Sequence, residues 1–178
     1  MTGTGNEDAL AAFEGLYATH GVRLKSIACN LLGNVADAED AVQEAFLKAY
    51  RAWGGFKGDS APFTWLYRIL VNSCMDAGRR RKRRREDPEP EAPAELRPAA
   101  GGDHPLRLAL EAALGRLAPR LRAVFLLAEA EGFTHREIAC ILDIAEGTSK
   151  SDLFQAKREL RRLLGGPKPL ATREEATP

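Results

Sequence analysis

The sequence predicts an all-α protein of two small helical domains, an N-terminal helical bundle and a C-terminal helix-turn-helix, joined by a flexible linker rich in proline and charge. Ala, Leu, Arg and Glu, which favour helix, are abundant, whereas Val and Ile are sparse. Apolar residues recur at the three-and-four spacing of amphipathic helices. We expect a first domain at 8–80, a linker at 81–105, a second domain at 106–166 and a disordered tail at 167–178.

Three helices are expected in the first domain. The first runs over about 9–32 and ends at Gly33 and Asn34, because these residue types readily adopt the left-handed conformation that stops a helix. The second, over 37–53, carries its apolar side chains on one face. The third begins near Pro62, since proline suits a helix's first turn, and continues into a basic run.

The segment 79–105 differs in kind from its flanks. It reads RRRKRRREDPEPEAPAELRPAAGGDHP and contains five of the ten prolines, with almost no large apolar side chains. Such a segment buries too little surface to offset the entropy lost on ordering. We therefore expect a flexible linker, whose basic run can contact phosphate groups.

The second domain is expected to end in a helix-turn-helix. An apolar helix covers 106–117, and Pro119 starts the next helix. Thr134 and Glu137 have the spacing of a capping box, which marks the start of a short helix. A four-residue turn, DIAE, then leads into a basic helix over 147–164.

Charge is segregated along the chain, although the formal net charge is only +1. Residues 1–50 hold three basic residues against seven acidic ones, whereas residues 79–85 are uniformly basic. A protein with an acidic face and separate basic elements is suited to touch both a protein and a polyanion.

Several classes of protein are not favoured. Cys29, Cys74 and Cys140 stand alone, with no metal-ligand spacing, so we expect small buried side chains in a reducing compartment and no metal. No secretory signal or membrane-spanning run is visible, which favours a cytoplasmic protein without membrane insertion. No paired carboxylates or activated nucleophile are evident, so neither a cofactor nor an enzymatic activity is expected.

Three patterns point to partners, each with a plainer alternative. The basic second helix of the helix-turn-helix suits the major groove of DNA, or is a solvated surface. Five aromatics interleaved with basic groups suit an unstacked single strand, or pack the core: Trp53, Phe56, Phe63, Trp65 and Tyr67. For Trp53 and Phe46 we favour the core, whereas for the residues of the loop 54–62 we favour contact with a single strand. Acidic and large apolar residues over 37–47 suit a protein interface, or are ordinary surface.

Two long stretches carry a family resemblance. They read NVADAEDAVQEAFLKAYRAWGGFKGDSAPFTWLYRILVNSCMDAGRR and RLAPRLRAVFLLAEAEGFTHREIACILDIAEGTSKSDLFQAKRELRR. In the order and separation of their elements they resemble the two domains of extracytoplasmic-function sigma factors, members of the sigma-70 family of bacterial RNA polymerase. The resemblance covers nearly the whole chain outside the linker and the termini.

The resemblance implies the partners and the residues that contact them. Core RNA polymerase would be bound through its flap and the coiled coil of its largest subunit, the latter by Asp37, Asp40, Gln43, Glu44, Phe46 and Leu47. Melted minus-ten DNA would be read by Phe56, Lys57, Gly58, Asp59, Ser60, Trp65, Arg68, Asn72, Asp76, Arg79 and Arg80. Double-stranded minus-thirty-five DNA would be read by Thr148, Ser149, Lys150, Ser151, Phe154, Gln155 and Arg158. An anti-sigma factor would hold the protein inactive.

The chain departs from the family's usual pattern at the helix-turn-helix. Asp143 stands at the turn where glycine is usual, and Ala145, which has no side-chain acceptor, stands at the cap position. Ser149 and Asp152 replace a common aliphatic and a common basic residue, and a carboxylate there would repel phosphate or accept a hydrogen bond from cytosine. These changes affect which bases are read.

Two other functions compete with a sigma factor. An autonomous helix-turn-helix repressor or activator, whose first domain senses a ligand or dimerises, would bind duplex DNA and give a symmetric footprint. A nucleic-acid enzyme is disfavoured for want of catalytic groups. The sigma hypothesis instead predicts poor DNA binding by the free chain, with two weak contacts reinforcing each other on polymerase.

Overall fold

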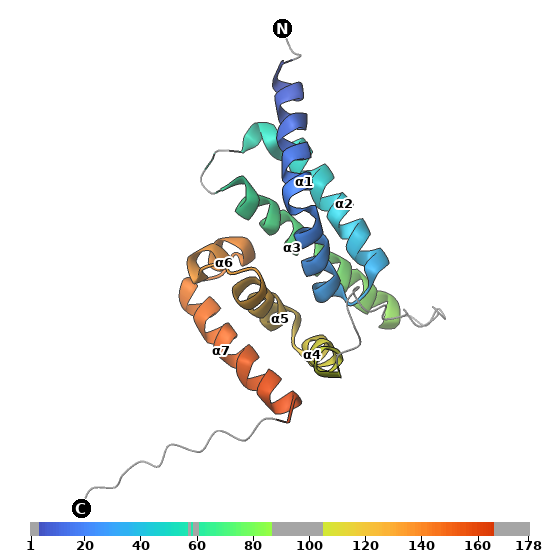
Figure 1. Cartoon of the computed structure of the whole chain (residues 1–178), viewed down its shortest axis with the longest axis vertical. Helices are drawn as coiled ribbons and strands as arrows, with labels where there is room; N and C mark the ends of the chain where they lie inside the picture. The colour runs from blue at the N-terminus through green and yellow to red at the C-terminus, as the bar shows by residue number, and fades with distance from the viewer. Residues whose placement is uncertain (1–3, 57, 59–60, 87–104, 166–178) are drawn as a thin grey trace, which may run out of the picture.

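The computed structural model describes residues 4–56, 58, 61–86 and 105–165. These residues form helices without any strand, so the predicted all-α fold is confirmed over the part described. The helices divide into an upper group, α1 to α3, and a lower group, α4 to α7 (Figure 1). The proposed tail at 167–178 and linker residues 87–104 lie outside the described residues.

The first group is a three-helix bundle made of α1 (Thr4–Leu32), α2 (Val35–Ala52) and α3 (Pro62–Glu86). Gly33 ends α1 at a φ of 68°, as expected, whereas Asn34 is extended and caps α2 by accepting from the next backbone N–H groups. Each helix packs on the other two. Their core is made of buried aliphatic side chains such as Leu24, Ile27, Ala45, Leu66, Leu70 and Val71.

The second group contains α4 (Pro105–Arg116), α5 (Pro119–Phe125), α6 (His135–Leu142) and α7 (Glu146–Leu163). Pro119 starts α5, as predicted, but α5 widens into a π-helical turn, η2 (Leu126–Ala130), instead of continuing as one regular helix. Residues of all these elements share a core, including Leu114, Val124, Leu127, Ile138, Ile141 and Leu160.

The start of α6 bears the predicted capping box. The Thr134 N–H and hydroxyl both donate to Glu137 Oε2, at 2.8 and 2.7 Å, and Thr134 Oγ1 accepts from the Glu137 N–H. Two orphan backbone donors of the first turn are therefore satisfied. At the other end Asp143 adopts the left-handed conformation at a φ of 54°, and Ala145 begins α7 without a side-chain cap.

Replacing Glu137 by alanine should lower the free energy of unfolding by about 1 kcal/mol at pH 7. Hydrogen bonds from the Thr134 hydroxyl and N–H hold the pKa of Glu137 below its ordinary value. The stabilisation is thus present above the ordinary carboxyl pKa and is lost as the pH falls through the lower folded value. Urea denaturation at several pH values would measure this. A difference from wild type that is the same at every pH would contradict it.

The two groups of helices pack against each other. Residues of α3 lie against α6, and α1 lies against both α4 and α5. Arg122 on α5 donates to the carbonyl of Leu31 at the end of α1, at 2.9 Å. The sequence predicted two domains but not this contact, and α3 continues to Glu86, so residues 81–86 of the expected linker are helical.

The cysteines follow the prediction only in part. Cys74 is buried and burial raises the pKa of its thiol to about 12, whereas Cys29 is half-buried and Cys140 is exposed. The expectation of a buried Cys140 was therefore wrong, because it lies on the outer face of α6. Among the described helices, none has the length and apolar character needed to cross a bilayer.

Candidate functional site

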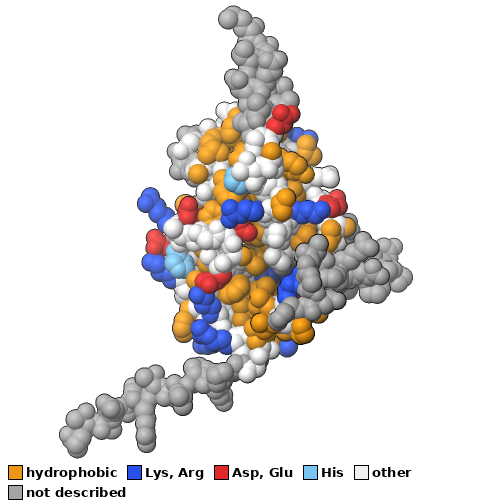
Figure 2. Space-filling model, in the orientation of Figure 1, with side chains coloured by type: hydrophobic (Ala, Val, Ile, Leu, Met, Phe, Trp, Pro, Cys, Tyr) orange, Lys and Arg blue, Asp and Glu red, His pale blue; other side chains and the backbone are white. Residues whose placement is uncertain are grey.

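Helix α7 presents a polar face with one large aromatic side chain. Ser151, Phe154, Gln155 and Arg158 are exposed at the spacing of one helical face, and Lys150 is exposed beside them. Phe154 is 66% exposed and lies among polar side chains of this face. Thr148 is half-buried. In the space-filling view, basic side chains gather at the edge formed by α6 and α7, with acidic ones among them (Figure 2).

Ser149 and Asp152 lie on the opposite, inner face of α7. Ser149 is fully buried, and its Oγ lies 2.9 Å from His135 Nδ1 on α6. Asp152 is also buried, and its Oδ2 lies 2.8 Å from Arg120 Nε on α5. The prediction that Ser149 contacts DNA is therefore corrected: its side chain joins two helices. The Asp152 carboxylate likewise points inward and is paired with Arg120, with only 6% of its side chain exposed.

A compact aromatic cluster lies where α2 meets α3. Trp53 and Phe56 stack with centroids 5.5 Å apart, and Trp65 lies 5.1 Å from Phe56. Arg68 and Asn72 are exposed on the following turns of α3. Lys57, Asp59 and Ser60 lie outside the described residues, and the intervening Gly58 takes a left-handed φ of 76°.

Phe63 and Tyr67 do not belong to this cluster. Tyr67 is fully buried, and Phe63 packs on it with centroids 4.5 Å apart. Both rings contact Phe133 of the second group of helices. Packing holds for Phe63 and Tyr67, and Trp53, Trp65 and Phe46 are likewise partly buried against the core, as expected for Trp53 and Phe46. Phe56 is half-buried and stacks on Trp53 at the edge of the core.

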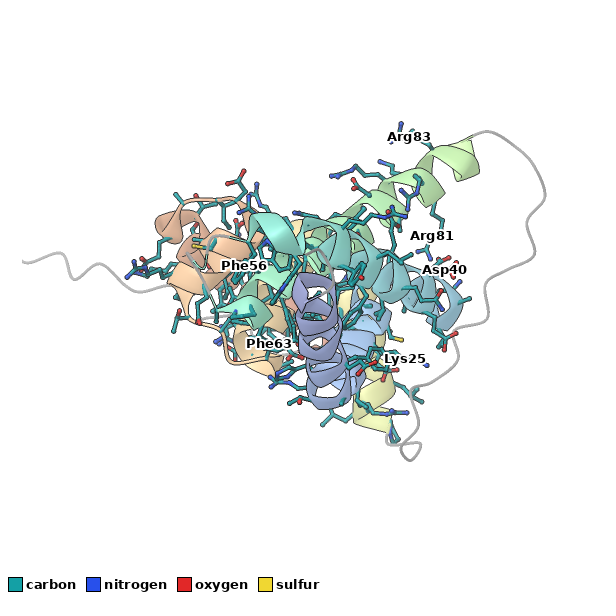
Figure 3. All side chains as sticks on the ribbon, turned by 90° about the horizontal axis from the view of Figure 1, so that it is seen from above. Lys25, Asp40, Phe56, Phe63, Arg81 and Arg83 are labelled. Carbon is teal, nitrogen blue, oxygen red and sulfur yellow. The ribbon has the colours of Figure 1, made fainter. Side chains whose placement is uncertain are left out.

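Basic side chains at the end of α3 pair with acidic side chains of α2. Arg81 lies 3.3 Å from Asp37 and also donates to the Leu32 carbonyl, while Arg80 lies 3.5 Å from Glu44. Figure 3 shows Arg81 and Asp40 at the same end of the first domain, away from Phe56 and Phe63. Glu44, which is predicted to bind polymerase, and Arg80, which is predicted to bind DNA, are therefore neighbours.

These ion pairs perturb the carboxylates involved. A hydrogen bond from Lys48, with Arg80 nearby, lowers the pKa of Glu44. A hydrogen bond from Arg79 similarly lowers the pKa of Asp76 within α3. Both carboxylates are partly exposed, so each ion pair contributes little to stability. Either carboxylate can therefore leave its arginine or lysine and pair with a charged group of a binding partner.

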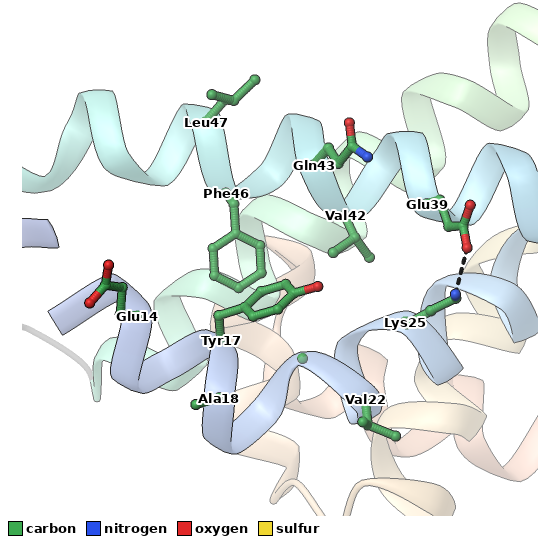
Figure 4. A pocket seen from close by; sticks show the side chains of 11 residues that line it. Glu14, Tyr17, Ala18, Val22, Lys25, Glu39, Val42, Gln43, Phe46 and Leu47 are labelled. Atoms are coloured by element: carbon green, nitrogen blue, oxygen red, sulfur yellow. Dashed lines mark hydrogen bonds and ion pairs between the residues drawn. The ribbon is translucent and has the colours of Figure 1, made fainter. Parts of the chain in front are cut away.

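A groove of about 950 Å³ lies between α1 and α2 (Figure 4). Three of the predicted polymerase-binding residues line it: Gln43, Phe46 and Leu47. The α1 wall was not predicted; it is formed by Glu14, Tyr17, Ala18, Gly21, Val22 and Lys25. Tyr17 packs edge-on against Phe46 with centroids 5.2 Å apart.

The α1 wall of the groove is apolar and open. Val22 on α1 is 87% exposed, and Leu47 on α2 is 56% exposed. A signal for this wall was present in the sequence, since 17, 18, 21 and 22 recur on one helical face. It was missed because that face is separate from the one that fills the bundle core.

The described residues offer no metal-binding constellation. Among them, no group of three or more His, Cys, Asp or Glu side chains is arranged to hold a metal ion. What the structure provides is a set of surfaces: an exposed helix face on α7, an aromatic cluster with Arg68 and Asn72, and an apolar groove.

Known proteins share this arrangement. The Sigma-70 region 2 family matches residues 16–84, and the Sigma-70 region 4 family matches residues 107–160. The sigma factor SigM of Mycobacterium tuberculosis is 37% identical over 86% of this chain and 78% of its own length. The sigma-E factor of Escherichia coli is 36% identical over 70% of this chain and 72% of its own length.

Two solved structures extend the likeness to the fold. The sigma factor RpoE of Bartonella quintana, in complex with the anti-sigma factor NepR, has a TM-score of 0.73 and 29% identity, covering 88% of this chain and 99% of its own. CnrH, in complex with the cytosolic domain of CnrY, has a TM-score of 0.68 and 27% identity, covering 90% and 94%. The chain therefore belongs to the extracytoplasmic-function sigma factors of the sigma-70 family.

Proposed function

We propose that this sigma factor binds core RNA polymerase through the α1–α2 groove and directs promoter-specific initiation. In this proposal the first domain binds melted DNA and the second domain binds duplex DNA. The observation that carries the proposal is the separation of two chemically distinct surfaces. One is an aromatic cluster with basic and amide groups, and the other is an exposed helix face in a helix-turn-helix. The first suits melted strand and the second suits duplex.

The α7 face suits the major groove at the minus-thirty-five element. Gln155 can hydrogen-bond to base edges, Phe154 can contact a thymine methyl group, and Lys150 and Arg158 can meet phosphates. The inner contacts of Ser149 and Asp152 fix α7 on α6 and α5, so that the outer face is presented in one orientation. Ser151 belongs to this face, and the half-buried Thr148 flanks it.

The aromatic cluster suits the minus-ten element once its strands separate. Trp53, Phe56 and Trp65 offer ring faces for an unstacked base, while Arg68 and Asn72 lie on the next turns to meet the backbone or a base edge. Arg79 and Arg80 extend the positive surface along α3. Asp76, which binds Arg79, orients that guanidinium.

The groove suits a helical protein partner, such as the coiled coil of the polymerase's largest subunit. Its floor is apolar, through Phe46 and Val42, and its rim carries Gln43 and the Lys25–Glu39 ion pair. An apolar centre with a polar rim is the usual anatomy of an interface. Asp37, Asp40 and Glu44 also lie on α2 but do not line the groove, and they add electrostatic complementarity beside it. The polymerase flap would bind the second domain.

Two structural neighbours are sigma factors bound to an anti-sigma factor or to a cytosolic partner domain. An anti-sigma factor for this chain would compete with polymerase for the groove, because both partners need an exposed apolar surface. Neither partner requires catalysis by this chain, and we assign it no enzymatic activity.

Fluorescence anisotropy with promoter DNA, in the presence and absence of core polymerase, tests this function. Tight, specific binding should require core polymerase, and run-off transcription should start at defined sites. Tight binding by the free chain, with a symmetric footprint, would instead establish an autonomous helix-turn-helix regulator.

Replacing Phe154 by alanine should weaken open-complex formation about tenfold on promoters that carry a minus-thirty-five element, through the loss of roughly 1–2 kcal/mol of base contact. Phe154 is exposed, so the fold should be retained. Leu164→Ala, an exposed apolar residue at the end of α7, is the matched control. Equal loss in both variants, measured by run-off transcription, would argue against the assigned face.

A further inference from the structure

The turn between η2 and α6 reaches from the second domain into the first. The Glu131 carboxylate accepts from Tyr67 Oη at 2.7 Å and from Arg23 Nε at 3.1 Å, and Arg23 also donates to the Glu131 carbonyl at 3.2 Å. Only 8% of the Glu131 side chain is exposed. Both side-chain donors to this carboxylate found among the described residues therefore come from the other domain.

An aromatic contact accompanies the carboxylate. Phe133 stacks on Phe63 with centroids 5.9 Å apart and meets the edge of Tyr67 at 4.9 Å. The guanidinium of Arg23 lies 5.7 Å from the centroid of Phe63. Glu131 of the turn thus pairs with Arg23 on α1, and Phe133 of the turn packs against Phe63 and Tyr67 on α3.

The turn itself is fixed by its own domain. Gly132 adopts a φ of 75°, a conformation that favours glycine, and lies between the two inserted residues. The Glu131 N–H donates to the Leu126 carbonyl, and the Phe133 N–H donates to the Leu127 carbonyl at 2.9 Å. The turn is therefore pre-organised for docking and does not have to order on contact.

We propose that Glu131 and Phe133 form a docking plug, that Arg23, Phe63 and Tyr67 form its receptor, and that this interdomain latch holds the free chain closed. The plug that fills the receptor is therefore a turn of the same chain. The polar part is suited to reversible closure, because the carboxylate and the guanidinium can each be hydrated when the domains part.

Closure has a consequence that rests on the proposed function. Minus-ten and minus-thirty-five elements are separated by about 25 base pairs, roughly 85 Å of B-form DNA. A domain of this size is roughly 30 Å across, so two domains in direct contact cannot reach both elements. The latch must open for both elements to be engaged.

Small-angle X-ray scattering of the full chain tests the latch. Arg23→Gln and Glu131→Gln should each shift the open-to-closed ratio about tenfold or more, since each removes charge-assisted hydrogen bonds. Arg23 is half exposed, so its replacement should leave the first domain folded. Combining Arg23→Gln, Glu131→Gln and Phe133→Ala should give a clear rise in radius of gyration and maximum dimension. Glu129→Gln, an acid of η2 that pairs with Lys157 inside the second domain, is the matched control.

The scattering profiles and the polymerase-binding measurements test the latch and the proposed function separately. A combined variant that keeps its helical content and the wild-type scattering profile would overturn the latch, as would equal expansion of Glu129→Gln. A variant that expands while neither it nor the wild type binds core polymerase would leave the latch standing and refute the proposed function. Expansion together with stronger promoter binding, at limiting polymerase, would support both.

Discussion

Replacing Arg120 by alanine should lower the free energy of unfolding of the second domain by about 2–3 kcal/mol. The Arg120 guanidinium lies over Asp152, whose side chain is only 6% exposed, and no other cation is found beside that carboxylate among the described residues. Removing the arginine leaves a buried carboxylate without its countercharge. The exposure of Arg120 itself keeps the effect below that of a fully buried pair. Urea denaturation followed by circular dichroism would measure the loss.

A double-mutant cycle separates this mechanism from lost packing. Arg120→Ala combined with Asp152→Ala should be less destabilised than Arg120→Ala alone, because no uncompensated charge then remains in the core. Arg136→Ala, at an exposed position of α6, should change the unfolding free energy by less than about 0.5 kcal/mol. Additive effects of the two alanine substitutions would show that Arg120 and Asp152 act independently.

Elements whose signals are local were predictable from the sequence. Pro62 and Pro119 start helices, Gly33 ends one, and the Thr134–Glu137 box caps another, because each acts on neighbouring backbone groups. The helix-turn-helix followed from the same kind of evidence. These local signals predicted where helices begin and end, and the family resemblance predicted which of their surfaces bind DNA and polymerase.

The orientation of α7 was predictable but was overlooked. Ser149, Asp152, Ala156 and Leu160 recur at the three-and-four spacing of one face, and all four are buried. The family resemblance nevertheless implied a DNA contact for Ser149, and that implication was not weighed against the helical spacing. Their partners, His135 and Arg120, lie on other helices, and no local pattern reveals such pairs.

Contacts between the domains could not be predicted. Glu131 and Tyr67 are far apart in sequence, and neither their spacing nor their local composition marks them as partners. Arg23 was likewise one of only a few basic residues in an acidic segment. Tertiary contacts of this kind depend on how complete domains fit together, which helical periodicity does not describe.

The groove gives the prediction with the largest effect on function. Replacing Leu47 by aspartate should weaken binding of core polymerase at least tenfold and abolish promoter-specific transcription at limiting polymerase. The side chain lines the groove and is 56% exposed, so the free chain should fold normally, yet a partner would have to bury the new carboxylate against Phe46 and Val42. Affinity for core polymerase can be measured by competition against the wild-type chain.

Leu106→Asp separates this effect from a general loss of surface apolarity. Leu106 is more exposed than Leu47 and lies on α4, outside the groove. It should therefore leave polymerase affinity within about twofold of wild type, since it lies outside the groove that we propose as the main polymerase contact. If Leu106→Asp weakened polymerase binding as much as Leu47→Asp, polymerase would be contacting the second domain as strongly as the groove. If Leu47→Asp had no effect, the coiled coil would have to dock elsewhere on α2, where the acidic side chains of Asp40 and Glu44 would be the remaining candidates.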